Sequence, residues 1–145
     1  MQLGTAPRKG FNVIEMTMVL AIVATLSAIT LPRAGGFIDS IEVRGAVTEI
    51  DAIFSTARHA AITRGSQAVL EIDPELGVMT IRVGSDTLQR REVSAAHGVL
   101  IDSNRASITY SPIGVGYGAG NLTMVVSRKR ASDTLYVSRL GRVRH

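Results

Sequence analysis

The chain has 145 residues, which is enough for one small globular domain and the segment that carries it, and its formal charge is +4. It contains no cysteine, which excludes a disulfide framework, a thiolate metal site and a cysteine nucleophile. Its 16 basic and 12 acidic side chains nearly balance, so net charge alone does not identify a class of partner.

An apolar stretch follows the first ten residues. No charged residue occurs between Glu15 and Arg33, and residues 11–32 would form a helix about 33 Å long at roughly 1.5 Å per residue. That length matches a bilayer core, which a helix of roughly 20 apolar residues can cross. The stretch is apolar on all sides, whereas a buried helix of a soluble protein usually keeps a polar face. We therefore expect residues 11–32 to span a membrane.

Glu15 is the feature that a simple membrane anchor leaves unexplained. An ionisable group inside a membrane segment is costly and usually has a partner and a function. If the chain were cut after Gly10, Phe11 would carry a new ammonium about one helical turn from Glu15. A secretory signal is cut after its apolar region, whereas this leader, residues 1–10, ends before it. The apolar helix would therefore stay with the mature protein.

The segment Lys9-Gly10-Phe11-Asn12-Val13-Ile14-Glu15, with the apolar run and Pro32 behind it, resembles the N-terminal signature of type IV prepilins and type II secretion pseudopilins. The resemblance implies that a prepilin peptidase cuts after Gly10 and methylates Phe11. It implies that Glu15 pairs with a neighbouring pilin's N-terminus when a filament assembles. It also implies a single-pass protein of the bacterial inner membrane, whose head lies in the periplasm and later in a periplasmic filament.

The next part of the chain, residues 33–65, is predicted to be an amphipathic helix. Pro32, Gly35 and Gly36 weaken helical structure, so we expect a kink near the membrane surface, or the end of one helix and the start of another. Apolar residues then recur at three- and four-residue spacing. They are Ile38, Ile41, Val47, Ile50, Phe54, Ala57 and Ala61. Gly65 is a suitable C-terminal stop, so this stripe is expected to pack on the helix's own domain.

Beyond Gly65 the hydrophobic period changes to two, which predicts a β-rich head over residues 66–145. The expected strands are 67–73, 78–83, 87–93, 98–102, 106–110, 122–127, 134–138 and 142–144. The turn Pro74-Glu75-Leu76-Gly77 would join the first two, and the polar third strand suits an exposed edge. Strands at such short spacing favour antiparallel sheets and an α+β fold.

A second resemblance lies toward the C-terminus. Residues 108–114, 121–126 and 135–138 and the terminal Gly141-Arg142-Val143-Arg144 are similar to the GspH/FimT branch of pseudopilins. This resemblance implies a pilin-like fold, in which a long N-terminal helix carries an antiparallel β-sandwich-like head. It also implies a minor pseudopilin, a structural subunit of a type II secretion pseudopilus or a type IV pilus.

No pattern predicts an active site, a cofactor or a metal site, so we expect no enzyme. Four glycines alternate over residues 114–120, but a strand-like segment follows them, which favours a hairpin loop over a phosphate-binding loop. His59, His97 and His145 stand alone, without a second metal ligand at suitable spacing. A single-span membrane enzyme or receptor remains an alternative, but it would need a convergent polar pocket that the sequence does not indicate.

The basic C-terminal end supports a different alternative, DNA binding. Its basic residues are Arg128, Lys129, Arg130, Arg139, Arg142 and Arg144. Alternate residues of a strand share a face, so Arg142 and Arg144 would point the same way. Arg128 and Arg130 would form a second such pair, and the two pairs could contact successive phosphates. Some FimT-type pilins that serve natural transformation end in a similar Gly-Arg-x-Arg sequence, although Tyr136 is the only aromatic residue near the arginines.

Overall fold

The computed structural model describes residue 10 and residues 12–117, 121–138 and 142–144. The chain divides into two compact units, Met1–Gly35 and Gly36–His145. One helix, α1 (Val13–Arg64), contributes to both units. It is continuous through Pro32, Gly35 and Gly36, so the alternative of two separate helices is wrong. A proline removes one hydrogen bond of the ladder, and the remaining bonds on either side hold the helix together. The kink stays a prediction.

The second half of α1 buries one stripe, as the sequence predicts, but the stripe begins differently. Its buried apolar members are Val43, Ala46, Val47, Ile50, Ile53, Phe54, Ala57 and Ala61. Ile38 and Ile41 were expected in the stripe and are instead 53% and 51% exposed. Asp39 occupies the buried position one turn before Val43, with only 5% of its surface exposed. The helical register therefore places a carboxylate, rather than an isoleucine, against the head.

Gly65 ends α1 as expected. It has a φ of +58°, its N–H donates to the Ile62 carbonyl at 3.3 Å, and the Ser66 N–H donates to the Ala61 carbonyl at 3.2 Å. This pair of bonds satisfies the last carbonyls of a helix when a glycine adopts the left-handed conformation.

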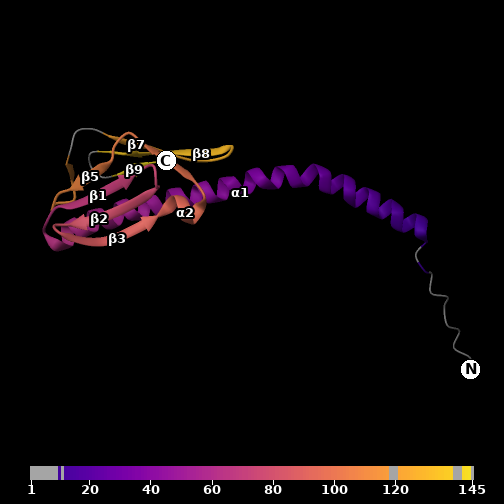
Figure 1. Ribbon diagram of the computed structural model, residues 1–145, viewed down its shortest axis with the longest axis horizontal. Helices are drawn as coiled ribbons and strands as arrows, with labels where there is room; N and C mark the ends of the chain where they lie inside the picture. Colours follow the sequence, from indigo (N-terminus) through magenta and orange to yellow (C-terminus); the bar gives the residue numbers. More distant parts are fainter. Residues whose placement is uncertain (1–9, 11, 118–120, 139–141, 145) are drawn as a thin grey trace, which may run out of the picture. The chain divides into compact units, whose positions relative to one another are not determined.

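The head contains two antiparallel sheets, which with α1 confirm the predicted α+β fold (Figure 1). One sheet has the order β3-β2-β1-β5-β6 and the other has the order β4-β7-β8-β9. The strands are β1 (Ala68–Asp73), β2 (Val78–Val83), β3 (Asp86–Glu92), β4 (Leu100–Ser103), β5 (Ser107–Tyr110), β6 (Gly116–Tyr117), β7 (Leu122–Arg128), β8 (Ala131–Val137) and β9 (Val143–Arg144). β3 is an exposed, charged edge strand, which discourages pairing with other chains.

Two elements were not predicted. A short helix, α2 (Val93–His97), follows β3 where the strand was expected to continue through Val93. The glycine-rich stretch contains β6, whose Tyr117 and Gly116 pair with Thr109 and Tyr110 of β5. The turn between β5 and β6 is closed by the Ser111 N–H, which donates to the Val115 carbonyl at 2.8 Å. This part of the stretch is therefore a β-hairpin, as favoured over a phosphate loop, and Gly118 and Gly120 lie outside the described residues.

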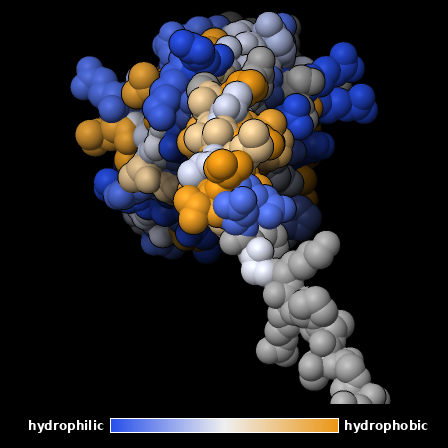
Figure 2. Space-filling view, turned by 90° about the vertical axis from the view of Figure 1, so that its right-hand side faces the viewer, coloured by the Kyte–Doolittle hydropathy of each residue, from blue (hydrophilic) through white to orange (hydrophobic). Residues whose placement is uncertain are grey.

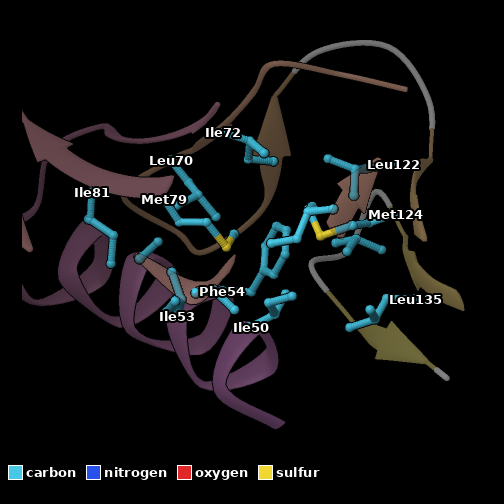
Figure 3. Close-up of a cluster of buried hydrophobic side chains, with 14 of the residues drawn as sticks. Ile50, Ile53, Phe54, Leu70, Ile72, Met79, Ile81, Leu122, Met124 and Leu135 are labelled. Carbon is cyan, nitrogen blue, oxygen red and sulfur yellow. The ribbon is translucent and has the colours of Figure 1, made fainter. Parts of the chain in front are cut away.

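One hydrophobic core joins the second half of α1 to both sheets. Ile50, Ile53 and Phe54 of α1 point toward side chains from the two sheets (Figure 3). Leu70, Met79 and Ile81 come from the five-stranded sheet, and Leu122, Met124 and Leu135 from the four-stranded sheet. Among the described residues, every buried apolar side chain has a number of 43 or higher. The core therefore belongs entirely to the second unit.

Candidate functional sites

The start of α1 carries the residues predicted to act in processing and assembly. Gly10 is exposed and precedes the helix, and Phe11 lies outside the described residues. The Asn12 side-chain oxygen accepts a hydrogen bond from the Ile14 N–H at 3.4 Å, as an N-cap does. Glu15 follows in the first turn, where the helix dipole favours a carboxylate. Within the described part of the chain, Glu15 forms no ion pair.

The first half of α1 presents apolar side chains to its surroundings. Every described side chain from Val13 to Leu31 is exposed, and this part of α1 is long and apolar enough to cross a membrane. Seen from its N-terminal side, the helix shows clustered orange apolar groups (Figure 2). Thr17, Thr25 and Thr30 donate their hydroxyl groups to α1 carbonyls at 2.8–2.9 Å. Such internal bonds are what a polar side chain requires where no water is present.

The four arginines of the predicted DNA site do not form one surface. Arg128 ends β7, whereas Arg130 lies in the two-residue turn before β8, so the two do not share a strand face. This expectation was wrong because the strand ends at Arg128, two residues before Arg130, and the turn residue Lys129 has a φ of +49°. Arg144 pairs with Tyr136 near the opposite end of β8, about 20 Å from Arg130 at roughly 3.3 Å per strand residue.

Arg128 is occupied by contacts within the head. Its Nε donates to Asp39 Oδ1 at 3.1 Å, and its Nη1 donates to the backbone carbonyl of His97. The Asp39 side chain is 7% exposed and that of Arg128 is 26% exposed. Removing one partner from such a buried pair would leave the other charge buried without compensation, so the pair of Arg128 and Asp39 stabilises the head.

Arg142 and Arg144 remain available and line one groove. The groove has a volume of about 370 Å³ and is also lined by Asn121, Tyr136 and Ser138. Tyr136 is 54% exposed, which places an aromatic ring beside the two guanidinium groups. The Ser138 hydroxyl accepts a hydrogen bond from the Arg142 N–H at 3.2 Å and so holds the segment that leads into β9. Gly141, which belongs to the predicted motif, lies outside the described residues.

His97, expected to stand alone, is held between two carboxylates of α1. Its Nδ1 lies 3.1 Å from Glu42 Oε2, and its Nε2 lies 3.0 Å from Glu49 Oε2. The sequence did not reveal this cluster because 48 and 55 residues separate the partners. The carboxylates contact opposite nitrogens of the ring, so they cannot converge with it on one metal ion. Among the described residues no group of three such side chains could hold a metal.

The chain resembles pilins in sequence and in fold. No protein-family model matches it. Two curated proteins of Pseudomonas aeruginosa, each described as a fimbrial protein, are 35% identical to it over 68 residues, which is 47% of this chain and 44% of each relative. The match therefore spans less than half the length of these relatives.

Two solved structures share the fold. The type IV minor pilin FimU of Pseudomonas aeruginosa has a TM-score of 0.63 and 16% identity, and the alignment covers 74% of this chain and 90% of FimU. The minor pseudopilin EpsH from the type 2 secretion system of Vibrio cholerae has a TM-score of 0.55 and 11% identity, over 71% of this chain and 94% of EpsH. Fold and sequence similarity together support the pilin and pseudopilin superfamily.

Proposed function

From the pilin and pseudopilin superfamily as a premise, we propose that this protein is a minor pilin or pseudopilin of the GspH/FimT type. It is a non-enzymatic subunit of a type II secretion pseudopilus or a type IV pilus. The observation that carries the proposal is the pairing of an apolar, fully exposed half-helix from Val13 to Leu31 with a pilin-like head. A half-helix of this kind must be covered by lipid before assembly and by other subunits afterwards.

The proposed cycle begins in the inner membrane. Prepilin peptidase removes residues 1–10 after Gly10 and methylates the amino group of Phe11, which keeps its positive charge. Residues 11–32 hold the subunit in the membrane with its head in the periplasm. When the subunit enters a filament, Glu15 pairs with the N-terminal ammonium of a neighbouring pilin. Both charges lie in an apolar environment, where their attraction is far stronger than in water.

The role of Glu15 can be tested with the full chain in cells that assemble the filament. Glu15→Ala should remain in the membrane fraction but fall at least about tenfold in sheared filaments, since an unpaired charge in an apolar environment costs more than the roughly 1.4 kcal/mol that a factor of ten requires. Immunoblots of the two fractions measure this. Ser27→Ala, in the same apolar segment, is the matched control and should assemble normally.

Two outcomes would contradict this proposal. One is normal incorporation of Glu15→Ala into filaments. The other is a wild-type chain whose mass shows that it still begins at Met1 when prepilin peptidase is co-expressed. A Gly10→Val chain supplies the reference mass for the unprocessed protein.

DNA binding for natural transformation is the second candidate, and the groove beside β9 favours it. Arg142 and Arg144 line this groove together with the exposed ring of Tyr136. Guanidinium groups bind phosphates, and an aromatic ring can stack on an exposed base. Arg128 is not part of this surface, because its guanidinium group is paired with Asp39.

A gel-shift measurement with the detergent-solubilised full chain tests this candidate. The double variant Arg142→Ala/Arg144→Ala should bind DNA much more weakly, and the salt dependence of its binding should fall by an amount that corresponds to about two phosphate contacts. Arg90→Ala/Arg91→Ala, on the exposed β3 edge, removes the same charge and should bind as the wild type does. A wild-type chain that does not retard DNA at about 50 mM salt would eliminate the candidate.

A further inference from the structure

A polar groove runs between α1 and the start of β8. Two hollows of about 420 and 380 Å³ share Arg44 and Asp133 as lining residues, so they form one continuous depression. Its other lining residues are Ser40, Val43, Val47, Thr48, Arg130, Ala131 and Ser132. We call this depression, together with the adjacent Lys129, the basic groove.

The cations of the basic groove have no strong partner in the head. The side chains of Arg44 and Arg130 form no ion pair or hydrogen bond among the described residues, and both residues are exposed. Lys129 Nζ lies 3.9 Å from Asp39 Oδ1, an oxygen that already accepts from Arg128 at 3.1 Å, and 74% of the lysine side chain is exposed. Asp133 also lines the groove, and Asp39 is already paired with Arg128, so the groove keeps an excess of positive charge that attracts anions.

The position of the basic groove is set by the buried ion pair. Arg128 joins the end of β7 to Asp39 of α1, so the following turn, Lys129 and Arg130, must lie next to this part of the helix. Asp39 comes eight residues after Leu31, the last residue of the apolar run. Eight residues span about 12 Å as a helix and less than about 30 Å when fully extended. Arg44, the cation that α1 contributes to the groove, comes 13 residues after Leu31, which corresponds to about 20 Å along a helix.

We propose that the basic groove binds the headgroup of an anionic phospholipid in the leaflet from which α1 emerges. The inference rests on the proposed function, in which residues 11–32 cross the membrane. The guanidinium groups of Arg44 and Arg130 can each hold a phosphate oxygen pair in a bidentate contact, and Lys129 adds a third charge. An anionic membrane surface attracts each such cation, and the attraction fades within a Debye length. The head would then be held against the membrane until the filament withdraws it.

A lipid suits the basic groove better than DNA does. Duplex DNA needs a row of cations that follows its backbone, whereas this groove holds three cations around one carboxylate in a short depression. The basic groove is also distinct from the groove of Arg142 and Arg144, which lies near the other end of β8.

The test uses the detergent-solubilised full chain and native mass spectrometry. Short-chain phosphatidylglycerol and phosphatidylcholine are titrated separately, and the ratio of their apparent Kd values is the readout. Wild type should prefer phosphatidylglycerol. Arg44→Gln and Arg130→Gln should each reduce the preference about fivefold, in line with a contribution of about 1 kcal/mol for each cation near an anionic surface. Asp133→Asn should increase the preference because it removes the opposing charge.

Arg90→Gln/Arg91→Gln is the matched control and should keep the wild-type preference. Equal affinity of the wild type for the two lipids would overturn the proposal. So would complete displacement of phosphatidylglycerol by inorganic phosphate at equal concentration, which marks a free-phosphate site, or by a short DNA duplex, which marks a nucleic-acid site.

Failure of the proposed function is recognised separately. If α1 does not span the membrane, alkaline carbonate will release the chain from membranes whatever its lipid preference. If α1 is retained and the lipid preference is absent, only the groove assignment fails.

Discussion

At the scale of single residues, Tyr110 lies in the most restrictive environment of the three tyrosines. It is fully buried, whereas Tyr117 and Tyr136 are 60% and 54% exposed. Its hydroxyl group has no hydrogen-bond partner among the described residues. Burial raises the pKa of the Tyr110 phenol to about 12, with Asp51 raising it further and Arg58 opposing the shift. A buried hydroxyl without a partner costs stability.

Tyr110→Phe should therefore stabilise the protein by about 1 kcal/mol at neutral pH, because it removes an unsatisfied buried group. The folded-state pKa lies above the ordinary value of 10.0. The wild type should keep full stability below about pH 10 and lose about 2–3 kcal/mol as the pH rises through 12. Urea unfolding of the full chain in detergent at pH 8 and pH 11 measures both effects, and about half of the alkaline loss, roughly 1.4 kcal/mol, should be present at pH 11.

The phenylalanine variant should lack the alkaline loss that Tyr110 causes in the wild type. Tyr136→Phe, at an exposed position, should keep it. Equal alkaline losses in the wild type and Tyr110→Phe would show that another group is responsible.

The sequence predicted the local chemistry of single residues better than their contacts. Gly65 as a helix stop follows from its backbone freedom alone, which the sequence reveals directly. The contacts of Asp39 with Arg128 and of His97 with Glu42 depend on segments that lie 89 and 55 residues apart. No periodic pattern carries such information, because it arises only when the sheets fold back onto α1.

At the scale of elements, the β1–β2 turn and α2 depend on each other. Asp73 Oδ1 accepts from the N–H groups of Glu75 and Leu76 at 3.1 Å, which shapes the turn. Gly77 then adopts a φ of +61°, and its carbonyl accepts from the Ser94 N–H at 3.2 Å. A Cβ at residue 77 would collide with the side chain of Ser94. The missing side chain of Gly77 therefore makes room for α2.

Gly77→Ala should lower the free energy of unfolding by about 2–4 kcal/mol, since backbone strain and overpacking act together. Gly65→Ala is the matched comparison, because residue 65 also has a positive φ but open space around it. It should cost only the strain, about 1–2 kcal/mol. Urea unfolding of the full chain in detergent measures both variants. Equal losses in the two variants would show that Ser94 gives way without cost.

The sequence did not predict α2 because five residues are too few for a helical period to emerge. The strands were easier, since alternation over six or seven residues identifies β1, β2 and β7 directly. Their order in the sheets could not be predicted. β5 pairs directly with β1, although β2, β3 and β4 lie between them in the sequence and β4 belongs to the other sheet. This choice depends on the shared core rather than on any local turn.

At the scale of the whole molecule, the sequence predicted that the two parts of the chain lie in different environments, one apolar and one aqueous. Residues 11–32 are suited to an apolar environment, and the head has a composition suited to water. The structure agrees in its burial pattern, because no described side chain before Asp39 is buried. The predicted DNA site was only partly assembled, since strand alternation could not reveal that a turn separates Arg128 from Arg130.

The confinement of the core to residues 43 and beyond has a practical consequence for mutational work. Thermal melting of the head reports nothing about the anchor, so a substitution at Glu15 that abolishes filament assembly would pass every test of conformational stability. Conversely, a variant with a weakened core can still be inserted and processed normally. Screens that rank variants by melting temperature would thus miss one class of loss-of-function substitution entirely, and screens that score export would miss the other.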